Sequence, residues 1–214
     1  AIKDKKQIKD KFDIVLMAIG RKPNTENLNL EKIGIKLNDQ KAIVIDKKFK
    51  SSVDNIYAIG DVVPGPMLAH KAEEEGIACV EIIKGQKTHV NYENIPAIVY
   101  TNPEVASVGK TEEQIKNSNI EYKVGKFPFM ANGRALTTSA SEGFVKILVD
   151  KKTDSILGAH IIGHDAGQLI AEIVTTMEFG GSAEDIARIC HAHPTTSEAV
   201  KEAALNVDGR AIHI

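Results

Sequence analysis

The residues with the clearest chemical potential lie close to the C-terminus, in the run CHAHPTTSEA at residues 190–199. His193 and Glu198 are five residues apart in this run. The Pro-Thr-Thr turn between them allows both side chains to converge where a regular helix would not. An imidazole held by a carboxylate is a general base with a fixed tautomer and a raised affinity for protons. The spacing therefore makes His193 and Glu198 a candidate acid–base pair.

Each member of this pair also has a simpler interpretation. A lone histidine is more often a structural residue than a catalytic one. The run Thr195-Thr196-Ser197-Glu198 has the spacing of a capping box, which begins a helix without any catalytic role. Residue spacing alone leaves both interpretations open.

Composition excludes several classes of function. The 214 residues are 43% hydrophobic and 26% charged, and the formal net charge of −2 argues against a dedicated nucleic-acid surface. No apolar run approaches the roughly 20 residues of a membrane span, and the charged N-terminus does not resemble a signal peptide. Cys79 and Cys190 belong to no cysteine pair, so we expect no zinc or other metal site, no redox motif, and a reducing compartment.

The first part of the chain has the pattern of an incomplete α/β domain. Residues 1–10 are polar and hairpin-like, and residues 12–20 form a nearly continuous apolar run, typical of a strand buried on both faces of a parallel sheet. Nothing upstream supplies the βαβ units that would bury this strand, so we expect a truncated domain. Two further short strands are predicted at 42–46 and 56–61, and a helix is predicted between Pro66 and Lys84.

A second region begins near residue 93 and has the pattern of an α+β domain, an antiparallel sheet with packed helices. Helices are predicted from a capping box at 111–114, from Asp165 to Gly180, from Ser182, and from Thr195 or Thr196. The five predicted strands are at 97–101, 105–109, 121–127, 143–149 and 156–162.

The apolar residues of the last helices predict a two-fold dimer. The helix 165–180 carries one apolar stripe, formed by Leu169, Ile170, Ile173, Val174 and Met177. A further set of apolar residues also needs burial, and we do not expect one sheet to cover all of them. They are Ile186, Ile189, Ala203, Leu205 and Val207. The simpler alternative is that all of them pack within one subunit.

Three motifs together resemble the flavin- and nicotinamide-dependent disulfide reductases, and among them the dihydrolipoamide dehydrogenases. They are CHAHPT-x-SEA at 190–199, FPFMANGRA at 127–135 and PEVASVG at 103–109. Glutathione reductases are an alternative because they share the His-Pro-Thr run, but the flanking Cys-His-Ala and Ser-Glu-Ala favour the lipoamide enzymes. The resemblance covers essentially the whole chain.

The resemblance implies a domain layout. Residues 1–22 would end the NAD-binding domain, as the remnant of an α/β dinucleotide-binding domain. Residues 23–92 would be the returning segment of the FAD-binding domain, and 93–214 the interface or dimerisation domain.

The same resemblance implies cofactor contacts, with FAD and NAD in the full-length enzyme. The motif YAIGD at 57–61 places Asp61 on the ribityl chain of the flavin. The start of the following helix would face the flavin pyrimidine, through Met67, Leu68, Ala69 and His70. Gly20 would lie against the nicotinamide cofactor. Without the resemblance, Asp61 is a polar turn residue, the helix is an ordinary one, and Gly20 permits a turn after a strand.

For the acid–base pair, the resemblance implies catalysis across a homodimer. His193, oriented by Glu198, would deprotonate dihydrolipoamide bound to the opposite subunit, and the bond between His193 and Pro194 would be cis. Lipoyl domains of 2-oxo acid dehydrogenase complexes would be the partners, in the bacterial cytoplasm or the mitochondrial matrix.

The chain lacks two features of that enzyme family. No Gly-x-Gly-x-x-Gly fingerprint occurs, and there is no cysteine pair to form a redox-active disulfide. We therefore expect the chain alone to be inactive and to bind neither cofactor tightly. The competing hypothesis, from a different functional class, is an isolated homodimerisation module.

Overall fold

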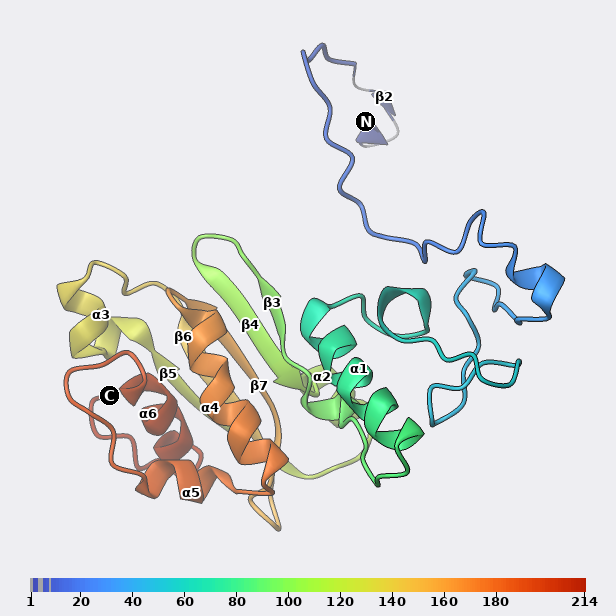
Figure 1. Ribbon diagram of the computed structural model, residues 1–214. Helices are drawn as coiled ribbons and strands as arrows, with labels where there is room; N and C mark the ends of the chain where they lie inside the picture. Colours follow the sequence, from blue (N-terminus) through green and yellow to red (C-terminus); the bar gives the residue numbers. More distant parts are fainter. Residues whose placement is uncertain (1, 4–5, 8) are drawn as a thin grey trace. The chain divides into compact units, whose positions relative to one another are not determined.

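The computed structural model describes residues 2–3, 6–7 and 9–214, and the chain divides into two compact units (Figure 1). The first unit is Ala1–Val90 and the second is Asn91–Ile214. Each has its own hydrophobic clusters. They are therefore described separately.

A five-stranded antiparallel sheet forms the centre of the second unit. The strand order is β3-β4-β7-β6-β5, and every neighbouring pair is antiparallel. All five predicted strands are confirmed, with ends shifted by one or two residues. Their bounds are β3 Ala97–Val99, β4 Glu104–Gly109, β5 Tyr122–Pro128, β6 Phe144–Asp150 and β7 Ile156–Gly163.

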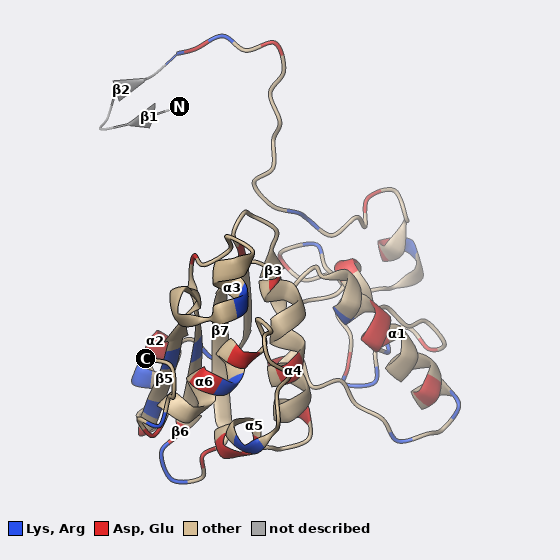
Figure 2. Cartoon of the chain, turned by 90° about the vertical axis from the view of Figure 1, so that its left-hand side faces the viewer, with Lys and Arg blue, Asp and Glu red and all other residues tan. Residues whose placement is uncertain are grey.

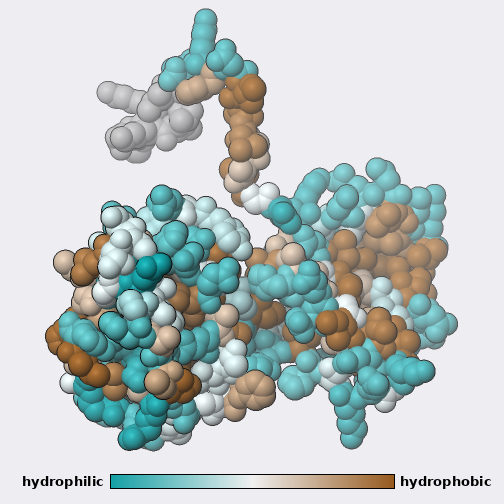
Figure 3. Space-filling model, turned by 60° about the vertical axis from the view of Figure 1, so that its left-hand side comes forward, coloured by the Kyte–Doolittle hydropathy of each residue, from teal (hydrophilic) through white to brown (hydrophobic). Residues whose placement is uncertain are grey.

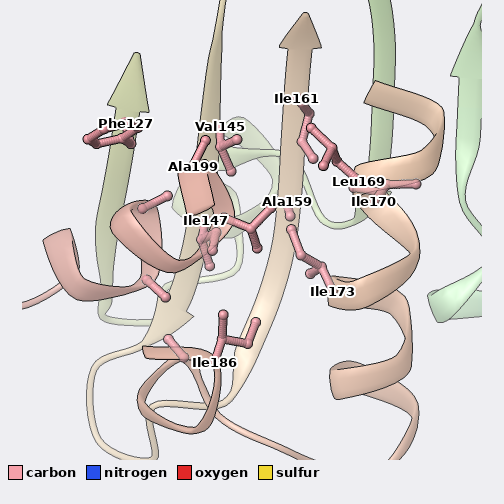
Figure 4. Packing of buried hydrophobic residues seen from close by; sticks show 14 of the residues in the cluster. Phe127, Val145, Ile147, Ala159, Ile161, Leu169, Ile170, Ile173, Ile186 and Ala199 are labelled. Carbon is pink, nitrogen blue, oxygen red and sulfur yellow. The ribbon is translucent and has the colours of Figure 1, made fainter. Parts of the chain in front are cut away.

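Three helices cover one face of this sheet: α4 (Ala166–Glu178), α5 (Ala183–Arg188) and α6 (Glu198–Asn206). Alternate residues of the strands point toward these helices, because successive side chains of a strand face opposite sides. Figure 4 shows this packing, in which strand residues such as Ile147 and Ala159 meet helix residues such as Ile173 and Ile186. The predicted α+β class is confirmed.

The opposite face carries the short helix α2 (Glu112–Asn117). Thr111 begins it with the predicted capping box, and Glu112 bonds to Lys146 of β6, on the face opposite to the core residues of that strand. Helix α5 begins after Ser182 as predicted, and the structure adds a capping box between Ser182 and Asp185 that was not predicted. The short helix α3 (Gly133–Thr137) follows β5 and a 3-10 turn at Phe129–Ala131.

Helix α6 lies unusually close to β5. A Cβ atom added to Gly125 of β5 would lie 2.0 Å from the carbonyl oxygen of Ala203 and 2.9 Å from the amide nitrogen of Val207. Only a glycine therefore permits this approach. The contact matters because α6 begins at Glu198.

The expectation that the apolar residues of the last helices need a partner subunit to cover them was wrong. Ile186, Ala203, Leu205 and Val207 are all buried within the second unit, whereas Ile189 is half exposed. Helix α6 packs on β5 and β6 of the sheet and also on α5, and this helix layer provides the cover that the sheet alone does not. These residues consequently give no argument for a dimer.

The first unit is built mainly from turns and one long helix, α1 (Ala69–Ile83). The predicted helix is confirmed, although it begins three residues after Pro66. Its exposed Glu73 and Glu74 give it an acidic outer face (Figure 2). The predicted hairpin is present where β1 (Ile2–Lys3) pairs with β2 (Lys6–Gln7), while residues 1, 4–5 and 8 lie outside the described residues.

The predicted strand at 12–20 is wrong. This segment has no strand, and its large apolar side chains are 72–89% exposed (Figure 3). A strand of this kind needs neighbours on both sides to satisfy its backbone groups and cover its side chains. No strand in the described part of the chain pairs with it.

The strands predicted at 42–46 and 56–61 are also wrong. Isolated bridges take their place, between Leu37 and Ile43 and between Lys50 and Tyr57. A 3-10 turn, Gly60–Val62, follows the second bridge.

In the described part of the chain, no helix combines the length and apolar character needed to cross a bilayer.

Candidate active site

The structure brings His193 and Glu198 together as the sequence predicts. Nδ1 of His193 lies 2.9 Å from Oε1 of Glu198. The other carboxylate oxygen, Oε2, accepts a hydrogen bond of 2.8 Å from the backbone N–H of Thr195. The bond between His193 and Pro194 is cis, which confirms the prediction for that turn.

The two side chains differ sharply in exposure. The His193 ring is 72% exposed, whereas the Glu198 side chain is 19% exposed. Partial burial raises the pKa of Glu198, but the hydrogen bonds from Thr195 and His193, together with the charges of His193 and His213, outweigh that effect and lower the pKa overall. A carboxylate acceptor at Nδ1 favours the tautomer that carries its proton there, which leaves a lone pair on Nε2 of this largely exposed ring.

Hydrogen bonds to Thr195 hold the segment around this pair. Ser197 precedes α6 without a side-chain capping bond, and the Glu198 carboxylate instead bonds to the Thr195 N–H. Asn132 donates a 3.0 Å hydrogen bond to the carbonyl of Thr195. A cavity of about 440 Å³ lies beside the turn, lined by Arg134, Thr138, His164, Asp165, Pro194, Thr195 and Thr196.

A second set of predicted residues gathers in the first unit, where the Gly60–Val62 turn precedes α1. Gly60 has φ +73°, a conformation that favours glycine, and its N–H donates 2.7 Å to Oε2 of Glu75. Lys71 donates 3.2 Å to the Gly60 carbonyl and pairs with Glu75 at 3.0 Å, with both side chains almost fully buried. This ion pair fixes the backbone immediately before Asp61.

Asp61 lies at the surface of this turn, where its carboxylate pairs with Arg21 at 3.1 Å. Leu68 precedes α1, and no side chain caps the helix. Met67, Leu68 and His70 are half-buried and Ala69 is exposed. A cavity of about 630 Å³ is lined by Arg21, Pro23, Val63, Gly65 and Met67, among others. Gly20 adjoins this region only through Arg21; it is exposed, with φ +130°.

Comparison with known proteins identifies the family. Residues 95–204 match the dimerisation domain of the pyridine nucleotide-disulphide oxidoreductases, and residues 1–76 match a second region of the same family. The chain belongs to this family.

Individual oxidoreductases of known name are similar over nearly the whole chain. Mitochondrial dihydrolipoyl dehydrogenase of Pisum sativum is 56% identical over 94% of this chain and 40% of its own length. The Sus scrofa protein of that name has the same identity and coverage. Leghemoglobin reductase of Glycine max is 57% identical over 90% of this chain and 37% of its own length. The chain thus spans about 40% of the length of these relatives.

Solved structures of oxidoreductases have the same fold. LpdA from Mycobacterium tuberculosis is 28% identical, covers 88% of this chain with 41% of its own, and gives a TM-score of 0.83. The HOCl-induced flavoprotein disulfide reductase RclA from Escherichia coli is 30% identical, covers 86% of this chain with 42% of its own, and gives a TM-score of 0.79. Both support the predicted reductase fold.

The residues before α1 fit the flavin that this oxidoreductase family implies. The N-terminus of this 15-residue helix has no side-chain cap, so its N–H groups and positive dipole end suit an electron-rich ring. The Asp61 carboxylate is accessible and can accept hydrogen bonds from sugar hydroxyls. Among the described residues, no cluster of His, Cys, Asp and Glu is placed to bind a metal ion.

Sequence reasoning missed two further His–Glu pairs of the oxidoreductase. His191 contacts Glu172 at 2.7 Å, and His213 contacts Glu202 at 2.8 Å. The members are 19 and 11 residues apart and come from different segments, so no local spacing indicates them. The His191 ring is 6% exposed, whereas the rings of His213 and His193 are 56% and 72% exposed and each contacts a glutamate through Nδ1. His193 is the most exposed of the three, a geometry suited to accepting a proton from another molecule.

Proposed function

We propose that this chain is the C-terminal part of a dihydrolipoamide dehydrogenase, which oxidises dihydrolipoamide and transfers the electrons through FAD to NAD. The observation that carries the proposal is the geometry of His193. Its Nδ1 is held by Glu198 at 2.9 Å while its Nε2 stays open. The named relatives, 56% identical over most of the chain, support the substrate class.

In this proposal His193 is the general base. Nε2 accepts a proton from one thiol of the substrate, and Glu198 stabilises the imidazolium that forms. Removal of that proton produces a thiolate, the nucleophilic form of sulfur, which can attack a disulfide elsewhere in the enzyme. The imidazolium later releases that proton to solvent, because oxidation of a dithiol by NAD liberates one proton overall. A positioned general base of this kind contributes roughly 10²–10⁴-fold in rate.

The first unit would provide part of the cofactor site. Bound FAD would supply the electron transfer between the dithiol and the nicotinamide. Asp61 would bind the ribityl hydroxyls, and the start of α1, from Met67 to His70, would place its positive dipole end at the pyrimidine. Gly20 would allow close approach of NAD. The domain layout of 1–22, 23–92 and 93–214 belongs to this proposal.

We further propose that His193 acts across a homodimer, so that each active site contains residues of both subunits. The match to a dimerisation domain over residues 95–204 supports this. Sedimentation of the chain at micromolar concentration tests it. Dimerisation predicts a species at twice the chain mass of 23.2 kDa, and a single species at the chain mass would contradict it.

The central test is replacement of His193 by glutamine in the full-length enzyme. We expect a loss of roughly 10²–10⁴-fold in dihydrolipoamide oxidation with little change in thermal stability, because the ring is largely exposed. Glu198→Gln should have a smaller effect, since the base remains but is less well oriented. Near-normal turnover of the His193 variant would remove the basis of the proposal.

The chain by itself should be inactive and should bind little flavin. A flavin absorption spectrum combined with an intact mass tests this directly. Stoichiometric yellow protein with lipoamide-dependent NAD reduction would overturn the expectation. If the chain dimerises but the parent enzyme lacks the activity, the alternative of a pure dimerisation module is favoured. Activity with glutathione disulfide would favour a glutathione-type reductase.

The cellular context follows from the same proposal. The partners would be lipoyl domains of 2-oxo acid dehydrogenase complexes, because these carry dihydrolipoamide. The relatives from Pisum sativum and Sus scrofa are named as mitochondrial, which favours the mitochondrial matrix over a bacterial cytoplasm. Pull-down of the full-length enzyme with a reduced lipoyl domain would test the partner.

A further inference from the structure

His191 occupies a different environment from His193, although only one residue separates them. Its side chain is 6% exposed, and Nε2 lies 2.7 Å from Oε1 of Glu172 on α4. Its Nδ1 lies 3.1 Å from the carbonyl oxygen of Ile189, in the same loop. The ring is thus buried between a helix and the backbone of its own loop.

Both nitrogens of this ring face oxygen acceptors. A neutral imidazole carries a single N–H. Two hydrogen bonds therefore require one additional proton, on the ring or on the Glu172 carboxylate. The titratable groups that the structure places in this network are Glu172 and Lys201.

The carbonyl of Ile189 connects this pair to a second helix. Nζ of Lys201, on α6, donates a 2.8 Å hydrogen bond to the same oxygen that His191 contacts. The loop that carries His193 is consequently held at Ile189 and His191 by α4 and α6. Buried side chains pack both helices on the sheet, so the position of the loop is fixed by the position of these helices.

We propose that His191 and Glu172 form a positioning pair, which fixes the loop and thereby the direction in which Nε2 of His193 points. This inference rests on the proposed acid–base function of His193. His191 offers no open ring nitrogen to a substrate, because each of its two nitrogens faces an oxygen of the protein. Their contribution is to hold the base where a dithiol can reach it.

The test compares two half-reactions of the full-length enzyme: reduction of the flavin by dihydrolipoamide and reduction of the flavin by NADH. His191→Ala and Glu172→Ala should slow the first by roughly 10–100-fold, since a displacement of about 1 Å at a catalytic group can cost on the order of 10²-fold. The NADH half-reaction should stay within about twofold, because it needs no base for a thiol.

A conservative variant separates charge from geometry. In Glu172→Gln the amide can donate to Nε2 of a neutral ring while Nδ1–H still reaches Ile189, so both hydrogen bonds survive. We expect its dithiol half-reaction to remain within about threefold of wild type. His89→Ala, at an exposed histidine of the first unit, is the matched control and should change neither half-reaction.

Three outcomes would overturn the proposal. They are unchanged dithiol reduction in both alanine variants, equal slowing of both half-reactions together with a lower melting temperature, and a Glu172→Gln enzyme as slow as Glu172→Ala. Where the alanine variants do not fold, His191→Asn is the deciding variant, because asparagine keeps a donor for the Ile189 carbonyl but loses the contact with Glu172. Dithiol reduction at the wild-type rate in this variant would overturn the proposal. Dithiol reduction surviving in His193→Gln would instead refute the proposed function.

Discussion

Replacing Gly125 by alanine should push α6 away from β5 and disturb the acid–base pair from a distance. The new Cβ would meet the Ala203 carbonyl at 2.0 Å, whereas ordinary contact begins near 3.4 Å. The two backbones must therefore separate by roughly 1.4 Å, since the obstacle is backbone and not a flexible side chain.

The expected cost has two parts. Overpacking of this kind destabilises by about 1–3 kcal/mol, and a backbone obstacle favours the upper end. Because α6 begins at Glu198, its displacement also lengthens the 2.9 Å contact to His193. A misplacement of about 1 Å can cost on the order of 10²-fold in rate, so dihydrolipoamide oxidation should fall by that order in the full-length enzyme.

The assay combines urea unfolding of the chain with turnover of the full-length enzyme. Gly133→Ala is the control, because this exposed glycine begins α3 and its added Cβ meets nothing within 4 Å. It should be neutral or stabilising by up to about 1 kcal/mol. Wild-type stability and turnover in Gly125→Ala would refute the argument that this close approach positions the pair.

Three further predictions concern other parts of the chain. Lys71→Met should destabilise the first unit by roughly 3–5 kcal/mol, because it leaves the Glu75 carboxylate buried without this cation. Adding Glu75→Leu should recover most of the loss. Hydrogen exchange of the α1 amides measures both effects. Hydrogen bonds, of which the one from Lys146 has the largest effect, lower the pKa of Glu112 from 4.5 to about 2. The stability that Glu112 adds relative to Glu112→Gln should therefore be fully present above pH 4.5 and be lost as the pH falls toward 2. Measurement of the unfolding free energy as a function of pH tests this. In alkylation experiments Cys190 should react first, whereas Cys79 should react only on unfolding, because desolvation by burial raises its pKa; equal rates would contradict this.

The second unit could be predicted from sequence because its signals are local. The alternation of apolar residues in the five strands and the capping boxes at Thr111 and Ser182 each depend on neighbours in the chain. His193 and Glu198 were predictable for the same reason, since only four residues separate them in the chain.

The failures share a physical cause, which is dependence on distant partners. The apolar pattern at 12–20 indicates what a segment does in a completed sheet, and the strand does not form without adjacent strands. The pair of His191 and Glu172 depends on how α4 packs against the sheet, which no spacing in the sequence encodes. The burial of Leu205 and Val207 likewise required the second layer of helices.

The contacts of Glu198 and Asn132 that hold the His193 segment have a genetic consequence, because both residues belong to the second unit, Asn91–Ile214. Among the described residues, the pair of His193 and Glu198 is therefore positioned by the second unit alone. If it acts across a dimer, two defective alleles should complement each other, one carrying His193→Gln and the other lacking the redox-active disulfide. In the mixed dimer one site combines both defects and the other combines both intact halves. Coexpression should therefore restore activity that neither allele has alone, with up to half of the sites in each mixed dimer working.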